Sequence, residues 1–492
     1  MAVTKPEVRV AAGAVRGRLE SGLAVFKGIP YAEPPARFAA PAPVRAWDGT
    51  RDALAYGPPP PQSGLLGTGG PAGSTGWLTV NVWTPETAAS LPVMVWIQGG
   101  GYLFGTSGLP EFDGRRLARD GGVIVVTLNY RVGIEGFAHI EGAPANRGLL
   151  DQVAALEWVR DNIGCFGGDP DRVTVFGQSA GGGSVAALLA MPRASGLFRR
   201  AIVQSMPGTF FTPELAADIT GALAAAAGLG TAELATVPPD ELPAVGDALM
   251  ARIGEYEDRW GLAAHRKVMM SPVVDGSTLP TDPWQALADG GARDVDLIVG
   301  HVRNEHRLFA LMDGLLGQVT EEQAATALDV FAPDRSGVEQ YRAGGAGPDE
   351  LYDRVHSDWL FRMPSLHLAE AHTGRVHLYE LTWQTPVMGG ALGACHGLDV
   401  PLVLGNLTSG QPAMLSGDDL AEAEVVSAQM RGAWTGFAAD GDPGWPVYDP
   451  VDRLTWVLDT EPEVATYPEE SSRRIWQDHV FSALPLPGKP DA

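Results

Sequence analysis

The stretch Val173-Thr174-Val175-Phe176-Gly177-Gln178-Ser179-Ala180-Gly181-Gly182 decides the fold of this chain. Its opening apolar, β-branched run predicts a buried strand. The pattern Gly-x-Ser-x-Gly follows at once, and residues 185–189 have the composition of a helix. A serine in a sharp turn between a strand and a helix can act as a nucleophile, because flanking glycines permit the strained backbone that exposes its hydroxyl. We therefore predict that Ser179 is a nucleophile, against the alternative of an ordinary glycine-rich turn.

Composition limits the classes of function. The chain has 492 residues, 45% of them hydrophobic and 19% charged, with a formal net charge of -24. Such a composition is typical of a globular protein with a large core. The negative charge argues against nucleic-acid binding, which needs clustered Lys and Arg. The two cysteines, Cys165 and Cys395, cannot form a disulfide framework, and no Cys/His cluster has zinc spacing, so we expect no metal and no cofactor.

The chain also shows no targeting signal. Its first residues have no apolar segment behind a basic start, and no stretch offers about 18 uninterrupted apolar residues. We therefore expect a cytoplasmic protein with no membrane partner. The sequence does not reveal the oligomeric state, and a monomer is the default expectation.

The order of apolar segments predicts the fold class. Residues 93–97 and 123–128 are near-continuous apolar runs, as in strands that are covered on both faces. A helix is predicted over residues 149–163 from its apolar spacing. Further strands are expected at residues 78–83, 201–203, 297–299 and 376–381, and an antiparallel set at residues 7–32. Strands separated by helices predict an α/β protein with a doubly wound, mostly parallel sheet.

Two long segments lie outside this alternation. Residues 212–265 and 310–372 are rich in Ala, Leu and Glu and have helical character. We interpret them as helical excursions that pack over one end of the sheet. The chain shows no internal repeat, so residues 1–492 are expected to form a single catalytic domain.

A second glycine-rich stretch predicts an oxyanion hole. Gln98-Gly99-Gly100-Gly101-Tyr102 follows the strand at residues 93–97, and its glycines let the backbone approach a ligand closely. The N–H groups of Gly100, Gly101 and Ala180 would face a tetrahedral oxyanion. The alternatives are a flexible turn or a phosphate cradle, but the stretch lacks both Gly-Lys-Ser/Thr and Gly-x-Gly-x-x-Gly.

Spacing alone leaves the acid and the base open. Glu305 is one candidate carboxylate, with His301 and His306 beside it, and Asp275 is another loop carboxylate.

The chain resembles type-B carboxylesterases, the cholinesterase-like branch of the α/β-hydrolase fold, and is similar to bacterial para-nitrobenzyl esterases. The resemblance covers nearly the whole chain. Besides the two glycine-rich stretches, its most specific matches are Asn162-Ile163 and Phe166-Gly167-Gly168-Asp169-Pro170. The family implies an α/β-hydrolase fold with a large, mostly parallel sheet and a serine carboxylester hydrolase activity, here on small to medium uncharged esters. The implied partners are the ester and water.

The resemblance also assigns the remaining site residues. The family's acid lies in an Asp/Asn-Glu pair, here Asn304-Glu305, and its base in a segment that matches Gly393-Ala394-Cys395-His396-Gly397-Leu398-Asp399. The implied catalytic triad is therefore Ser179, Glu305 and His396, in the chain order of α/β-hydrolases. Ser205 matches a position whose hydroxyl supports the acid.

Two departures from the family pattern stand out. Gln178 replaces a frequent glutamate before the nucleophile, which removes an anion near the base. Ser74-Thr75-Gly76-Trp77-Leu78 replaces the usual Ser-Glu-Asp-Cys-Leu, which removes the first disulfide and the glutamate expected to pair with Arg37. We hypothesise that the loop at residues 63–77 is therefore mobile and widens access to the site.

Two other functions compete with ester hydrolysis. An amidase or an acyltransferase could use the same triad. A non-catalytic, cholinesterase-like binding protein is a second alternative, but such proteins generally lack a complete triad. Cys395 adjoins His396, yet a buried small residue explains it more simply than a nucleophile does.

Overall fold

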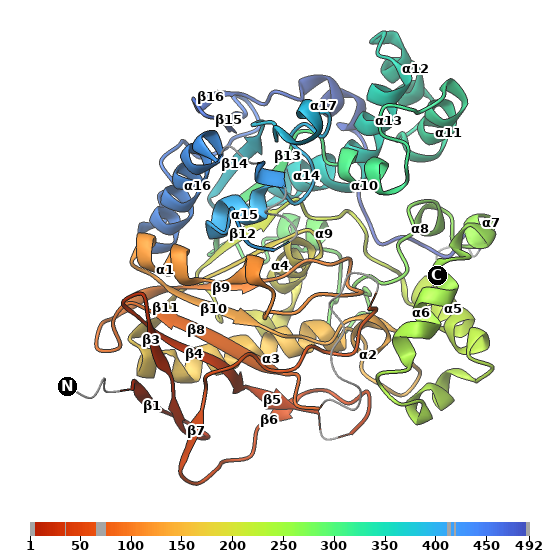
Figure 1. Ribbon diagram of the computed structural model, residues 1–492. Coiled ribbons are helices and arrows are strands. Elements are labelled where there is room, and N and C mark those ends of the chain that lie inside the picture. The colour runs from red at the N-terminus through yellow and green to blue at the C-terminus, as the bar shows by residue number, and fades with distance from the viewer. Residues whose placement is uncertain (1–4, 35, 65–74, 411–414, 418–419, 489–492) are drawn as a thin grey trace.

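One mixed sheet organises the chain (Figure 1). The computed structural model describes residues 5–34, 36–64, 75–410, 415–417 and 420–488. Within these residues the sheet has 11 strands. Their spatial order is β16 (Glu463–Thr466), β15 (Leu454–Leu458), β14 (Val376–Leu381), β13 (Asp296–Val302), β12 (Arg200–Gln204), β11 (Gly168–Gln178), β9 (Leu91–Ile97), β10 (Ile124–Leu128), β8 (Thr79–Thr84), β4 (Leu23–Pro30) and β3 (Arg18–Glu20).

The centre of the sheet is parallel, as predicted. Every neighbouring pair from β10 to β15 runs parallel, whereas β8, β4 and β3 at one edge and β16 at the other are antiparallel to their neighbours. The strand order reverses between β9 and β11. Loops that leave the carboxyl ends of strands at such a switch point diverge and leave room for a ligand. The glycine stretch after β9 and Ser179 after β11 both lie there.

Helices cover both faces of the sheet. Apolar side chains of α3 (Arg147–Asn162), α4 (Ala180–Ala190) and α14 (Met363–Ala371) belong to the core on one face. Those of α1 (Arg115–Gly121) and α16 (Ala421–Asp440) belong to the core on the other. Strands β10 and β14 are buried along their whole length, which explains their near-continuous apolar sequences.

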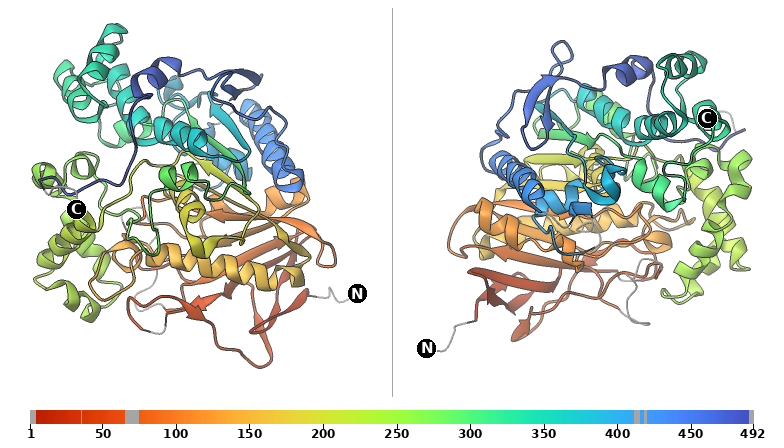
Figure 2. Two further views of the ribbon diagram at one scale, coloured as in Figure 1. Left: turned by 180° about the vertical axis from the view of Figure 1, so that it is seen from behind. Right: turned by 45° about the horizontal axis from the view of Figure 1, so that its top comes forward.

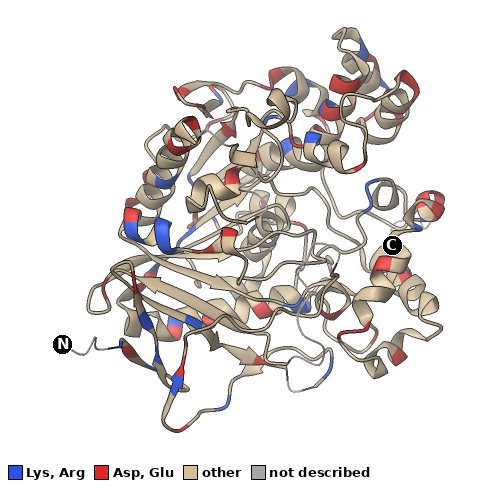
Figure 3. Ribbon diagram, viewed as in Figure 1, with Lys and Arg blue, Asp and Glu red and all other residues tan. Residues whose placement is uncertain are grey.

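The two predicted helical segments lie together on one side of the molecule (Figures 1 and 2). The first contains α5 (Pro213–Ala226), α6 (Leu242–Met250), α7 (Glu257–Trp260) and α8 (Leu262–His265). The second contains α10 (Arg307–Met312), α11 (Glu321–Phe331), α12 (Arg335–Ala343) and α13 (Pro348–Ser357), and reaches α14 through a π-helical turn, Asp358–Arg362. Figure 3 shows Asp and Glu spread along these outer helices.

Smaller elements complete the fold. The predicted antiparallel pairs in the N-terminal region are present as β3 with β4 and as β1 (Glu7–Val10) with β2 (Gly13–Arg16). The latter two join β7 (Thr50–Asp52) in a separate sheet, and β5 (Ala32–Glu33) pairs with β6 (Ala42–Pro43). The remaining α-helices are α2 (Gly133–Phe137), α9 (Pro283–Ala288), α15 (Asp399–Leu404) and α17 (Glu470–Trp476). No helix in the described ranges is long and apolar enough to cross a membrane.

Arg37 has a different partner from the one that the sequence suggested. The family's glutamate is absent at Thr75, but Arg37 Nη2 lies 2.6 Å from Glu135 Oε1, and its Nη1 donates to the carbonyl of Val237 at 2.7 Å. Glu135 therefore compensates a cation that the sequence left unpaired. The hypothesis of a mobile loop that widens access concerns residues 63–77, and residues 65–74 lie outside the described residues.

Candidate active site

Ser179 occupies a strained turn between β11 and α4. Its φ is 58° and its ψ is -128°, a combination that L-residues rarely adopt. The neighbouring glycines permit this turn, because a Cβ on Gly177 would lie 2.6 Å from the Gly181 carbonyl carbon and a Cβ on Gly181 would collide with the Ile97 carbonyl oxygen. Ser179 itself is only partly buried. Its hydroxyl is therefore held on a fixed backbone where a ligand can reach it.

The glycine stretch after β9 lies against this turn. A Cβ on Gly99 would lie 3.1 Å from Ser179 Cβ and only 2.8 Å from the Gln178 carbonyl oxygen, so a larger residue would force this backbone to move. Gly100 and Gly101 have φ of 121° and 59°, and in the described backbone their N–H groups make no hydrogen bond. Ala180 begins α4, and its N–H is one of the unpaired donors at a helix start. The stretch that carries Gly100 and Gly101 thus approaches Ser179 at Gly99, while Ala180 follows Ser179 directly in the chain.

Glu305 and His396 form a buried pair. Nδ1 of His396 lies 2.6 Å from Glu305 Oε2, and the side chain of Glu305 is fully buried. The other carboxylate oxygen accepts a hydrogen bond from the Val302 N–H at 3.1 Å. A carboxylate at Nδ1 fixes the imidazole tautomer and leaves Nε2 as the proton acceptor.

The other candidates for acid and base have different partners. Asp275 Oδ1 accepts hydrogen bonds from the N–H groups of Ser277 and Leu279, within its own turn. His301 Nε2 lies 2.9 Å from the Tyr467 hydroxyl, and burial lowers the pKa of His301 to about 4. His306 is buried with neither ring nitrogen hydrogen-bonded. The structure thus brings together the pair that the family resemblance implied.

Gln178 contacts the same histidine. Its Nε2 lies 3.3 Å from His396 Nε2, where the amide N–H can donate to an unprotonated ring nitrogen. Among the hydrogen bonds of the described residues, none joins Ser179 Oγ to His396. Catalytic hydrogen bonds often tighten only when substrate binds. Gln178 therefore occupies the face of the base that must turn to the serine.

Ser205 does not make the expected contact. Its N–H donates to the Gly300 carbonyl at 2.8 Å, which fixes the backbone beside β13. Its hydroxyl is buried and has no hydrogen-bond partner, so the predicted hydrogen bond to Glu305 is not formed.

Asn304 connects the loop that carries Glu305 (the acid loop) to the loop that carries His396 (the base loop), a role that the sequence did not reveal. Its N–H donates to the Ala394 carbonyl at 2.8 Å, and its Oδ1 accepts from the Ala394 N–H at 3.3 Å. Its Nδ2 donates to Asp353 Oδ2 at 3.0 Å. Since Glu305 and His396 each lie within two residues of this link, it fixes their separation.

Two aromatic rings pack on His396, and sequence analysis missed both. Phe361, from the π-helical turn, stacks on the imidazole with ring centroids 4.3 Å apart. Phe309 lies 5.2 Å from it and is only partly buried. Phe309 lies in α10, which begins two residues after Glu305, so only its nearness in the chain to the predicted acid could have suggested it. Nothing near Phe361 in the sequence points to the site.

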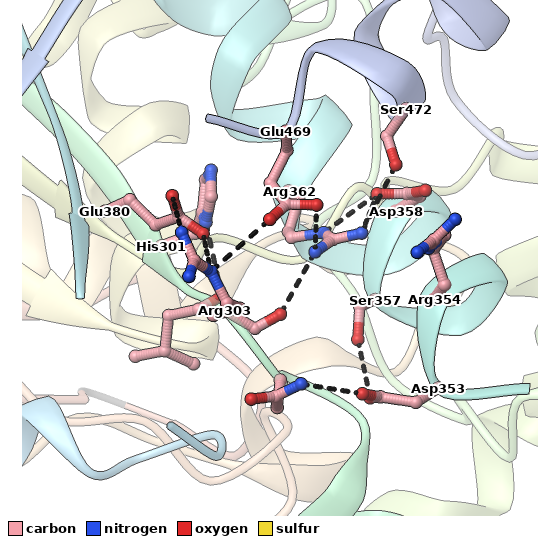
Figure 4. A network of polar contacts seen from close by, with 12 residues as sticks. His301, Arg303, Asp353, Arg354, Ser357, Asp358, Arg362, Glu380, Glu469 and Ser472 are labelled. Carbon is pink, nitrogen blue, oxygen red and sulfur yellow. Dashed lines mark hydrogen bonds and ion pairs between the residues drawn. The ribbon is translucent and has the colours of Figure 1, made fainter. Parts of the chain in front are cut away.

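Behind the acid loop lies a dense network of charges (Figure 4). Arg362 pairs with Asp358 at 2.6 Å and with Glu469 at 3.0 Å, and donates to the Arg303 carbonyl at 3.1 Å. Arg303 binds Glu380 through two hydrogen bonds of 3.0 and 3.1 Å. Burial raises the pKa of Glu380, whereas Arg362 and Arg303 outweigh burial and lower that of Glu469. The network holds the start of the loop that carries Glu305.

The cysteines and the polar clusters suggest no further chemistry. Cys395 is buried, and burial raises the pKa of its thiol to about 12, so it stays protonated at neutral pH. Within the part of the chain that the structure describes, no group of three or more His, Cys, Asp or Glu side chains is arranged to hold a metal ion.

Comparisons with known proteins identify relatives of the whole chain. The profile described as "Carboxylesterase family" matches residues 4–476. The chain is 40% identical to the para-nitrobenzyl esterase of Bacillus subtilis, over 94% of this chain and 96% of that protein. It is 36% identical to the phenmedipham hydrolase of Pseudarthrobacter oxydans, over 93% and 96%. A solved structure of a thermophilic PNB esterase superimposes with a TM-score of 0.85 at 38% identity, covering 96% of this chain and all of the other.

Proposed function

The chain belongs to the carboxylesterase family and is a carboxylic ester hydrolase of the α/β-hydrolase fold, and on this premise we propose that Ser179 is its nucleophile, His396 its base and Glu305 its acid. The observation that supports these roles best is the buried 2.6 Å contact between Glu305 and His396, in the loops that follow β13 and β14, at the same edge of the sheet as the strained turn of Ser179 after β11. We further propose that the whole chain acts as one catalytic unit and as a monomer.

The mechanism follows from these positions. Ser179 Oγ attacks the ester carbonyl while His396 Nε2 takes its proton, and Glu305 stabilises the imidazolium that forms. The N–H groups of Gly100, Gly101 and Ala180 donate to the oxyanion, each contributing on the order of 10²–10³ in rate. His396 then protonates the leaving alcohol. Water, deprotonated by His396, attacks the acyl-enzyme and releases the acid.

The proposed substrates are small to medium uncharged esters. The half-buried ring of Phe309 offers apolar surface beside the base, on which an alkyl or aryl group can pack. Gln178, on another side of His396, is uncharged, so it offers no ionic partner to a charged substrate.

The test is the rate on p-nitrophenyl esters from acetate to palmitate, for the wild type, Ser179→Ala and Ser184→Ala. Ser184 also has a buried hydroxyl on α4, but it accepts from Gln152 Nε2 at 3.1 Å, away from the reacting atoms. We expect Ser179→Ala to lose at least about 10⁴-fold in kcat, by analogy with other serine hydrolases, and Ser184→Ala to stay within several-fold of the wild type. Equal losses in both variants would remove Ser179 from its role.

A second measurement separates hydrolysis from acyl transfer. Competing alcohols or amines are added, and the acyl products are quantified. We expect the free acid to dominate. A product that is mostly new ester or amide would favour the acyltransferase alternative on the same residues.

A further inference from the structure

Arg266 is a buried cation whose charge no carboxylate among the described residues neutralises. It follows α8, and only 9% of its surface is exposed. Its Nε is buried without a hydrogen-bond partner, and no carboxylate among the described residues lies within 4.0 Å of its guanidinium nitrogens. Among the described residues, the guanidinium instead makes a cation–π contact, since its carbon lies 4.4 Å from the ring centroid of Phe309. A buried charge without a partner is costly and is seldom kept without a reason.

The surrounding groups do not supply the missing anion. Asp313 is the carboxylate that acts on Arg266 most strongly, but it forms an ion pair of 2.6 Å with Lys267. His306 and His356 lie close by, and burial lowers the pKa of both, that of His356 to about 3, so neither adds a charge. Burial itself lowers the pKa of Arg266 to about 10, which leaves it protonated at neutral pH. A full positive charge therefore remains for another group.

Arg266 lies close to the catalytic base. Its guanidinium carbon is 4.4 Å from the centroid of Phe309, and that centroid is 5.2 Å from the centroid of His396. Because these two distances add to 9.6 Å, the guanidinium carbon lies no farther than 9.6 Å from the His396 ring. A chain of a few carbon atoms spans that distance.

We propose that Arg266 binds an anionic group of the substrate, so that the enzyme prefers esters that carry a carboxylate a few carbons from the reacting carbonyl. Uncharged esters remain substrates, but they leave the guanidinium without a partner. A carboxylate suits this place because a planar guanidinium can donate two parallel hydrogen bonds to it. The inference rests on the proposed function, because the anion must belong to an ester that Ser179 attacks.

The carboxylate can belong to the acid or to the alcohol half of the ester, and two substrate pairs distinguish these. For the acid half, mono-p-nitrophenyl adipate is compared with the p-nitrophenyl ester of adipic acid monoamide, with the enzyme-free rate subtracted. For the alcohol half, 3-acetoxybenzoate is compared with 3-acetoxybenzamide. Each pair differs in charge and hardly in shape, so the ratio of kcat/KM within a pair measures recognition of the anion.

The variants are Arg266→Met, Arg266→Lys and, as a matched control, Arg259→Met. Arg259 belongs to the same helical segment but is exposed and paired with Asp218. We expect Arg266→Met to lower the anionic-to-neutral ratio of at least one pair by about 10- to 100-fold, the range for a hydrogen-bonded charge. Arg266→Lys should recover part of that ratio, and Arg259→Met should leave it unchanged.

The outcomes separate this inference from the proposed function. If the wild type cleaves neutral and anionic members equally, or if Arg266→Met lowers both equally, the inference is wrong while ester hydrolysis stands. If no ester of either kind is cleaved, the proposed function fails first. Should Arg266→Met not fold, the wild-type ratio and the Arg266→Lys ratio still decide, as does competitive inhibition by adipate relative to adipamide.

Discussion

Two buried arginines flank the acid–base pair, and the protein treats them in opposite ways. Arg362 is 3% exposed and pairs with Asp358 and Glu469. Arg266 is 9% exposed and contacts an aromatic ring instead of an anion. Each is associated with a ring that packs on His396, because Arg362 follows Phe361 in the chain and Arg266 lies against Phe309.

The pKa values express the same contrast. Burial opposes the charge of both arginines, but Asp358 and Glu469 outweigh it at Arg362 and raise that pKa. At Arg266 burial prevails, and the pKa falls to about 10. A cation whose anions come from the chain serves to hold the fold in place. A cation that has no anion from the chain can donate its hydrogen bonds to a ligand. This is the basis of the substrate preference proposed above.

The largest effect should distinguish the two arginines by stability. Arg362→Met leaves Asp358 buried without its cation and Glu469 with Arg303 alone, and we expect it to lower the free energy of unfolding by about 3–5 kcal/mol. Arg266→Met removes an unpaired buried charge, so we expect a change within about 1 kcal/mol, or a gain in stability. Urea unfolding of both variants checks this. Equal losses would mean that the two arginines play the same structural role.

A second effect concerns a carboxylate of the network. Burial raises the pKa of Glu380 from 4.5 to about 7. Between these values the native protein keeps a proton that the unfolded chain has released, so stability is full below the lower pKa and falls as pH rises through the upper one. Glu380→Gln carries no such proton. The free energy of unfolding of Glu380→Gln, relative to that of the wild type, should therefore increase by about 1–2 kcal/mol as the pH rises from about 5 to about 8.

The control for this measurement is Glu463→Gln, which changes an exposed carboxylate on β16. Its stability should follow the wild type across the same pH range. If the curve for Glu380→Gln also runs parallel to the wild type, then Arg303 keeps Glu380 ionised in the native state, and the network is fully compensated.

The smallest effect extends the comparison to the third side of His396, where the structure places the Gln178 amide 3.3 Å from Nε2. Gln178→Glu puts an anion there, which favours the imidazolium. We expect the acidic limb of the kcat/KM profile to move to higher pH by about half a unit to one unit. Gln178→Met, which removes the amide and adds no charge, should leave the limb near its wild-type position. A limb unmoved by Gln178→Glu would contradict an electrostatic role for this position.

Local parts of the site could be predicted from the sequence. Ser179, Gly100, Gly101 and Ala180 lie within short stretches where a strand meets a glycine-rich turn, and such turns have few backbone solutions. The parallel sheet could also be predicted, because strands covered on both faces have near-continuous apolar sequences.

Contacts between distant segments could not be predicted in the same way. Spacing left Glu305 open beside Asp275, and only the family resemblance paired it with His396. Asn304 joins loops about 90 residues apart by backbone geometry, which composition does not encode. Likewise, nothing in the sequence separates Arg266 from Arg362, since their difference lies entirely in which carboxylates the fold brings near.

The link between Asn304 and Ala394 has a consequence for biosynthesis. In the order of synthesis, β9, β11 and β13, together with Ser179 and Glu305, all precede residue 396. Without the segment after β14, Glu305 has no imidazole to orient and Ser179 no base. On the proposed roles, nascent chains cannot cleave esters, and activity begins only when the segment around Ala394 docks on Asn304, late in synthesis.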